Sequence, residues 1–286
     1  MTPVCPPDLR RHYAAGRLIP FIGAGASASL SWTSDGQARH PPNWRQMVDH
    51  ACAGLGFADS DLLRVRGTDL QILEFYSKRK GGIDELANWL TRQLDVPDDT
   101  LRDSAIHKGI SGLSAVPLIY TTNYDELIER ALALHGRTAE WVARERDLPK
   151  VLTRRQHGLD VCEVVKFHGD LRARETLVVT ESEYEERLRL ETPMDHRLRS
   201  DLLGRAVLFI GYSFRDPNVS YLFSLVERAF GELPEAQYGR RAFIAIPDPS
   251  EFERELFKQR NIDVIALDSG RLGEDTAELL SLVGEA

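Results

Sequence analysis

Cysteine is scarce in this sequence. The chain has three cysteines in 286 residues, at Cys5, Cys52 and Cys162. Their spacing fits neither a disulfide framework nor the paired Cys-x-x-Cys ligands of a structural zinc site. We therefore expect no bound metal, and a reducing compartment, the cytoplasm, as the location of the protein.

The sequence also lacks a long apolar run and an excess of positive charge. No run approaches the roughly 20 apolar residues of a membrane span. The N-terminal segment 1–8 lacks the basic start and apolar core of a signal peptide. The formal net charge of −8 argues against a broad nucleic-acid surface, which needs clustered Lys and Arg. We expect contact with neither a membrane nor, directly, a nucleic acid.

The stretch Leu18–Ser27 joins a short apolar run to a glycine turn. Gly23 and Gly25 have no Cβ, so the backbone can turn sharply and leave amide N–H groups open to an anion. The spacing Gly23-x-Gly25-x-x-Ala28 matches the dinucleotide-binding fingerprint with alanine in its last place. An ordinary strand followed by a turn produces the same pattern, so this stretch alone leaves both interpretations open.

Three later apolar runs end where polar residues or glycine begin. In open α/β sheets, ligands gather outside the carboxyl ends of the strands, so we expect the residues after these runs to share one site. The runs and the residues that follow them are 116–121 with Asn123 and Asp125, 162–167 with His168, and 206–210 with Gly211 and Ser213.

Apolar runs alternate with helical patterns over the rest of the chain. This alternation predicts a Rossmann-like α/β fold, a parallel sheet with helices on both faces. Apolar residues recur at helical spacing between the first two runs and predict an all-helical insertion after the first strand. We predict one domain over 1–286, with a core at about 8–28 and 113–286 and the insertion at about 43–112.

Three shorter segments also carry expectations. The polar segment Ser29–Pro42 is long enough for a mobile cover over the site. Apolar residues predict a short strand at Thr176–Thr180, and the acidic run that follows predicts a surface helix over Glu181–Leu190.

Four motifs occur in the order of the NAD-binding motifs of sirtuins. The longer phrases Thr121–Asp125 and Gly211–Asn218 look more like the bacterial sirtuin-like branch found in antiphage defence. Two features of protein-deacylating sirtuins are missing: the paired zinc cysteines and the Pro-Asp-Phe-Arg stretch after the glycine loop, near which Pro42-Asn43-Trp44 stands. The four motifs are Gly23–Ser27, Thr122–Asp125, His168–Gly169 and Gly211–Ser213.

The resemblance implies that NAD is the substrate and that Asn123 and His168 are catalytic. Asn123 can bond a ribose hydroxyl or water through both ends of its amide. A histidine that is neutral near pH 7 can accept a proton, and an unperturbed His168 would titrate at about 6.5. The residues expected to contact NAD are Gly23, Ala24, Gly25, Ser27, Asp125, Gly211 and Ser213.

Some of these residues have simpler interpretations. Asp125 could bond the nicotinamide carboxamide, brace its loop, or cap a helix that begins at Glu126. His168 could be an ordinary turn residue, and Ser213 an ordinary loop hydroxyl.

Three classes of function remain. The resemblance favours an NAD hydrolase (NADase) that releases nicotinamide and ADP-ribose and depletes NAD in antiviral defence. The alternatives are an NAD-dependent protein deacylase and a non-catalytic module that senses NAD or ADP-ribose. Because an unrestrained NADase would harm its own cell, we expect a homo-oligomer controlled by a protein partner. The resemblance suggests a HerA-type ATPase for that partner, with an Argonaute-like protein as the alternative.

Overall fold

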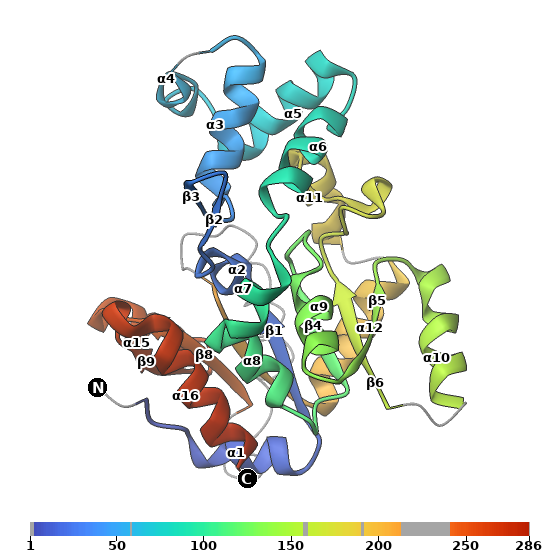
Figure 1. Ribbon diagram of the computed structural model, residues 1–286, viewed down its shortest axis with the longest axis vertical. Helices are drawn as coiled ribbons and strands as arrows, with labels where there is room; N and C mark the ends of the chain where they lie inside the picture. Colours follow the sequence, from blue (N-terminus) through green and yellow to red (C-terminus); the bar gives the residue numbers. More distant parts are fainter. Residues whose placement is uncertain (1–2, 58, 157–159, 190–191, 213–240, 286) are drawn as a thin grey trace.

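A computed structural model describes residues 3–57, 59–156, 160–189, 192–212 and 241–285. Its centre is a parallel sheet of seven strands (Figure 1). From one edge to the other, the strands are β5 (Thr138–Val142), β6 (Val161–Lys166), β4 (Leu118–Thr121), β1 (Leu18–Ile22), β7 (Ala206–Ile210), β8 (Ala242–Pro247) and β9 (Ile262–Leu267).

Strand β1 lies in the middle of the sheet and is buried along its whole length. Phe21 pairs in register with Tyr120 of β4 and Phe209 of β7, and its ring stacks on both at centroid distances of 5.5 and 5.4 Å. From β1 the chain builds one half of the sheet through β4, β5 and β6, and then the other half through β7, β8 and β9. The order therefore reverses between β1 and β7, where open α/β sheets bind their ligands.

The helices between β1 and β4 do not all pack in the same way. Four of them surround a core of their own that includes Met47, Leu73 and Leu86, while Ile106 and Ile110 of α8 pack into the core of the sheet. The four are α3 (Trp44–Gly54), α4 (Ser60–Arg64), α5 (Asp69–Lys80) and α6 (Asp84–Gln93), and α7 (Asp98–Asp103) and α8 (Ala105–Gly112) follow.

Two of these helices begin at capping residues that lie close together in the sequence. Asn43 and Gln46 form a capping box at the start of α3, and Thr68 and Gln71 form another at α5.

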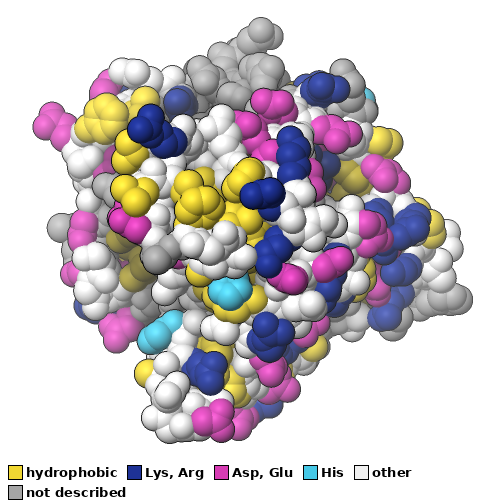
Figure 2. All heavy atoms as spheres, turned by 90° about the horizontal axis from the view of Figure 1, so that it is seen from above, with side chains coloured by type: hydrophobic (Ala, Val, Ile, Leu, Met, Phe, Trp, Pro, Cys, Tyr) yellow, Lys and Arg dark blue, Asp and Glu magenta, His cyan; other side chains and the backbone are white. Residues whose placement is uncertain are grey.

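Viewed from the end of the molecule that carries these helices, acidic and basic side chains are interspersed (Figure 2). The domain boundaries expected from the sequence stay a prediction.

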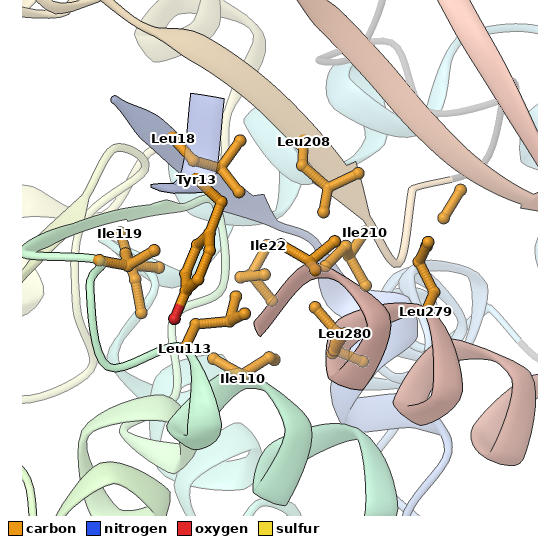
Figure 3. Close-up of a cluster of buried hydrophobic side chains, with 14 of the residues drawn as sticks. Tyr13, Leu18, Ile22, Ile110, Leu113, Ile119, Leu208, Ile210, Leu279 and Leu280 are labelled. Atoms are coloured by element: carbon orange, nitrogen blue, oxygen red, sulfur yellow. The ribbon is translucent and has the colours of Figure 1, made fainter. Parts of the chain in front are cut away.

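Both faces of the sheet are covered, as the apolar runs predict. On one face, Leu18 and Ile22 of β1 converge with Ile110 and Leu280 from the helices (Figure 3). This face is covered by α1 (Pro7–Ala14), α8, α9 (Leu127–Leu134) and α16 (Leu272–Gly284), and the other by α10 (Leu148–Gln156), α12 (Pro193–Gly204) and α15 (Glu251–Gln259). The fold class expected from the sequence is confirmed.

The segment after the glycine turn is more ordered than the sequence suggests. It contains α2 (Ala24–Ala28) and an antiparallel hairpin of β2 (Trp32–Ser34) and β3 (Gln37–Arg39). Asp35 and Gly36 connect the two strands with φ values of 53° and 72°, the conformation of a two-residue hairpin turn. Residues 29–42 are therefore not a loop throughout, and their expected role as a mobile cover stays a prediction.

One other expectation about strands was wrong, and one strand was not expected. Residues 177–180 form no strand and follow the short 3-10 helix η2 (Arg174–Thr176). Strand β5 was not expected, because it is an edge strand whose side chains are largely half-buried, so it has no continuous apolar run. The expected acidic helix is present as α11 (Glu181–Arg189). The remaining short helices are η1 (Glu145–Asp147) and η3 (Ser269–Arg271).

Candidate functional site

A cavity of about 700 Å³ opens over the carboxyl ends of β1, β4, β6 and β7. On the side of the insertion it is walled by Trp44, Arg45 and Met47, and by Tyr184 of α11. No helix among the described residues is long and apolar enough to cross a membrane. The expected site residues that line the cavity are Ala24, Gly25, Ser27, Asn123, Asp125, His168 and Gly211. Ser213 lies outside the described residues.

The amides of the glycine turn (residues 23–27) are less open than the sequence suggests. Gly23 donates its N–H to the carbonyl of Ile210, and Gly25 donates to the carbonyl of Gly211, both at 2.8 Å. These bonds tie the end of β1 to the end of β7. The amide of Ala24, the first residue of α2, has no partner within the described part of the chain.

Close backbone contact explains why glycine stands at Gly25 and Gly211. A Cβ on Gly25 would lie 2.7 Å from the carbonyl oxygen of Gly211, nearer than real Cβ atoms approach. Gly211 has a φ of +74°, and a Cβ there would lie 2.5 Å from the amide nitrogen of Ala26. The two turns lie where the strand order reverses between β1 and β7, which we call the switch point. They fit together only because both residues lack a side chain.

Asn123 is buried and presents one free acceptor. Its Nδ2 donates to the carbonyl of Gly23 at 3.3 Å and to Oγ of Ser27 at 3.2 Å. A carbonyl oxygen can only accept, so the amide nitrogen must face Gly23. The other end, Oδ1, is buried and has no hydrogen-bond partner among the described residues. Both hydrogens of Nδ2 are donated within the protein, so Oδ1 is the end that can bond a ligand or water, whereas the sequence allowed both ends.

The carboxylate of Asp125 holds the turn after β4, residues 122–126, which we call the Asn123 turn. Its Oδ1 accepts the N–H of Leu127 at 3.0 Å, at the start of α9, and its Oδ2 accepts the hydroxyl of Ser27 at 3.1 Å. Asp125 therefore braces its loop, while the N-cap of α9 is Glu126 and not Asp125. Each oxygen keeps a second lone pair, so contact with NAD stays a prediction.

His168 follows the end of β6 and is almost completely buried. It is 3% exposed, and its ring is 5.3 Å from that of Tyr184 in an edge-to-face arrangement. Burial, with a smaller effect of the Arg187 guanidinium, lowers the pKa of His168 to about 3. The imidazole is therefore neutral over the whole physiological range and free of the titration near 6.5 that an exposed histidine would show.

Several residues that build the site were not expected from the sequence. Thr121 accepts the amide of Asn123 on its hydroxyl oxygen at 3.0 Å and donates to the carbonyl of Ile22 at 2.8 Å. Thr122 and Tyr212 share a hydrogen bond of 3.0 Å between their hydroxyls. Thr121 and Thr122 directly precede Asn123, so their place beside it could have been inferred. Tyr212 could not, because its contact spans two distant strands.

The carboxylate, imidazole and thiol groups of the described residues form no cluster of three or more that could hold a metal ion. The polar groups that line the cavity include the amide, carboxylate, hydroxyl and imidazole described above, together with the guanidinium groups of Arg45 and Arg64. This set is suited to orienting a polar organic molecule and a water, and to accepting a proton.

Comparison with known proteins gives one family and several relatives. The family described as SIR2-like domain matches residues 117–265. The "NAD(+) hydrolase ThsA" of Acinetobacter baumannii (strain 532279) is 27% identical over 219 residues, 76% of this chain and 41% of that protein. The protein of the same name from Cytobacillus dafuensis is 28% identical over 214 residues, 74% of this chain and 38% of that protein.

A third relative is named for defence. "Defense-associated sirtuin 2" of Bacillus subtilis is 26% identical over 267 residues, which are 88% of this chain and 23% of that protein. The chain thus spans about two-fifths of the length of the first relatives and less of this one.

Proposed function

The chain belongs to the family of SIR2-like domains, whose model matches more than half of its residues, and from this membership we propose that it hydrolyses NAD to nicotinamide and ADP-ribose in antiphage defence. The names of the relatives support the reaction and its setting. The observation that carries the proposal is the free Oδ1 of Asn123, a buried acceptor in the wall of the cavity.

A buried acceptor without a partner costs free energy unless a ligand or water satisfies it. The Nδ2 of Asn123 is held by Gly23 and Ser27, so the direction of Oδ1 is fixed before a substrate arrives. We propose that Oδ1 accepts a hydrogen bond from the attacking water or from a ribose hydroxyl. Such a preset orientation lowers the entropy that the reaction must otherwise lose.

The reaction breaks the bond between the ribose C1′ and the nicotinamide nitrogen. The electron pair of that bond goes to nicotinamide, which leaves as a neutral molecule, and C1′ develops positive charge. A water oxygen then bonds to C1′ and releases a proton. Water that attacks a cationic carbon becomes acidic, so the weakly basic, neutral imidazole of His168 can accept this proton.

The rest of NAD is assigned to the switch point. The pyrophosphate would lie beside the glycine turn, where the Ala24 amide is the donor still available in the described chain. Gly211, which lines the cavity, is proposed to lie beside the phosphates, and Ser213 is proposed to contact the ribose. Asp125 would contact NAD through its remaining lone pairs.

The test is incubation of the purified protein with NAD and measurement of both products. Hydrolysis predicts nicotinamide and ADP-ribose in a ratio of one to one, with no acceptor peptide added. Nicotinamide release that requires an acylated peptide would favour a deacylase. Tight binding of ADP-ribose without turnover, alone or with partners, would favour a sensor module.

The proposed assembly rests on the resemblance alone. We propose a homo-oligomer that a HerA-type ATPase regulates, since hydrolysis of cellular NAD requires control. Native mass spectrometry of the chain, alone and mixed with such an ATPase, tests both parts. A monomer that turns over NAD at full rate and ignores the ATPase would contradict them.

A further inference from the structure

A lysine lies buried beneath the catalytic side of the site. Lys166 is the last residue of β6, two residues before His168, and its side chain is completely inaccessible to solvent. Its Nζ does not reach the cavity. It donates instead to the backbone carbonyl of Asp125, in the middle of the Asn123 turn.

Four charged residues, Lys166, Asp170, Glu129 and Arg172, form a network around this contact, which we call the Lys166 network. Lys166 Nζ lies 3.4 Å from Oδ2 of Asp170 and 3.8 Å from Oε1 of Glu129. Arg172 bridges the same two carboxylates: its Nε and Nη2 donate to both oxygens of Asp170 at 2.7 and 2.6 Å, and Nη2 also donates to Glu129. Arg172 also lies 3.4 Å from the exposed carboxylate of Glu126, so the network extends to the Asn123 turn.

The network joins the segments that carry the two proposed catalytic residues. Glu129 belongs to α9, which follows the Asn123 turn, and Asp170 belongs to the turn that contains His168. Two further bonds run alongside: the Leu171 amide donates to the carbonyl of Tyr124 at 3.0 Å, and the Tyr124 hydroxyl donates to the carbonyl of Val178 at 2.7 Å.

Stability alone does not account for a lysine at this position. Burying ions is costly, and apolar side chains of similar volume often replace a buried ion pair without loss of stability. Hydrogen bonds have fixed directions, whereas apolar packing tolerates small displacements. A lysine that donates to a backbone carbonyl can therefore fix the position of a turn more narrowly than a methionine could.

We propose that Lys166 is a positioning residue for the proposed NAD hydrolysis: it holds the Asn123 turn, through the carbonyl of Asp125, at the distance from His168 that the reaction requires. The Asp125 carboxylate, on the same residue, holds Ser27, which in turn accepts from Asn123. A displaced Asp125 carbonyl would therefore misdirect the free Oδ1 of Asn123. This inference rests on the proposed function for its effect on rate, but not for its effect on the turn.

The test compares two charge-balanced double variants. Lys166→Met with Glu129→Gln removes one cation and one anion and leaves the paired bonds between Arg172 and Asp170. The matched control is Glu163→Gln with Arg197→Met. Glu163 lies on the same strand, 1% exposed, and Arg197 of α12 donates to both of its oxygens, but neither residue lines the cavity.

The first measurement is amide hydrogen exchange over residues 122–127, in the free protein. Exchange should become at least about 10-fold faster in the Lys166 variant and stay within about 3-fold of wild type in the control. Equal exchange in the two double variants would overturn the proposal. In the wild type itself, the amides of Asn123 and Leu127 should open no more readily than β6, and rapid local opening there would overturn it even if a variant fails to fold.

The second measurement is turnover of NAD. The Lys166 variant should lose about 10- to 100-fold in kcat, because small misplacements of reacting groups have effects of this size, while its KM changes little. The control should keep the wild-type kcat. Equal losses in both variants would reduce Lys166 to a structural role. If the wild type releases no nicotinamide, the proposed function fails, while the exchange measurement still tests the positioning.

Discussion

At the scale of single residues, the site depends on the free oxygen of Asn123 and on the neutral imidazole of His168. Asn123 donates from its Nδ2 to Gly23 and Ser27, and its Oδ1 has no partner among the described residues. His168 is buried with an edge-to-face aromatic neighbour, so its imidazole stays neutral. Both residues act through a lone pair, which is what a reaction that generates a cationic carbon and then releases a proton needs.

The pH dependence of turnover tests the state of His168. Its pKa is lowered to about 3, mainly by burial, so the neutral form persists far below pH 6.5. We predict that kcat/KM, followed by nicotinamide release, stays level from about pH 7.5 down to pH 5. His168→Ala should lose turnover while its affinity for ADP-ribose, measured by calorimetry, changes little. An acid limb in the wild type with its midpoint at about 6.5 would show that His168 titrates like an exposed histidine.

Gly25→Ala tests the close contact at the switch point. The new Cβ would meet the backbone of Gly211 at 2.7 Å, and backbone cannot rotate away as a side chain can. We predict a loss of about 1–3 kcal/mol in the free energy of unfolding, measured in urea, together with weaker binding of ADP-ribose. The control is Gly273→Ala in α16, where the Cβ would meet no atom within 4 Å. Equal stability of the two variants would show that the turns can separate without cost.

At the scale of elements, the sequence was most informative where a strand is buried on both faces. The continuous apolar residues of β1 and β7 mark these strands because helices cover them on both sides. Strand β6 is buried along its whole length as well, although Glu163 and Lys166 interrupt its apolar residues. The edge strand β5 contains Glu140 and is half-buried, so it produced no such run. Leu177 and Val179 pack into the core of the insertion and do not join the sheet.

The location of the site could be predicted from the sequence by the same reasoning, but the hydrogen bonds within the site could not. Parallel strands end at one edge, so Asn123 and His168 could be placed together from the sequence. The bonds that occupy the Gly25 amide and the nitrogen of Asn123 depend on the register between strands far apart in the chain. Lys166 is a partial exception, because a charged residue inside an apolar run is itself a signal of a buried partner.

Amide hydrogen exchange in the β2–β3 hairpin tests how the segment after the glycine turn responds to a ligand. Pro41 and Pro42 line the cavity, whereas Leu30 and Trp32 pack against Leu101 and Leu127. We therefore predict that ADP-ribose slows amide exchange in peptides covering 43–48 and leaves the hairpin at 32–39 within about 2-fold of the free protein. Strong slowing across 32–39 would instead indicate that the whole segment closes over the site as a cover.

At the scale of the whole molecule, one sheet supplies both the rigid core and the site. The strand order reverses beside β1, the helices after it add a wall with Trp44 and Met47, and α11 adds Tyr184. The buried polar groups that make this arrangement specific also make its stability depend on pH. His107 on α8 is 1% exposed, and burial lowers its pKa to about 4.

Stability should therefore fall in mild acid. His107 and His168 have folded-state pKa values of about 4 and 3, below the value of about 6.5 in the unfolded chain. The unfolded chain binds more protons between these values, so stability is greatest above about pH 6.5. It should fall by up to about 1.4 kcal/mol per histidine for each pH unit towards pH 4. Urea unfolding at pH 7 and pH 5 measures this slope, and His107→Gln should reduce it. A slope unchanged by that variant would contradict a buried neutral His107.

The central claim is that this cavity cleaves NAD with the free oxygen of Asn123, and one comparison tests it most directly. Nicotinamide release from NAD is measured for the wild type and for Asn123→Ala, with ADP-ribose affinity determined on the same samples. We predict that the variant folds, binds ADP-ribose within about 3-fold of the wild type, and loses at least about 100-fold in kcat. A soluble Asn123→Ala protein that binds ADP-ribose and releases nicotinamide at the wild-type rate would contradict the claim.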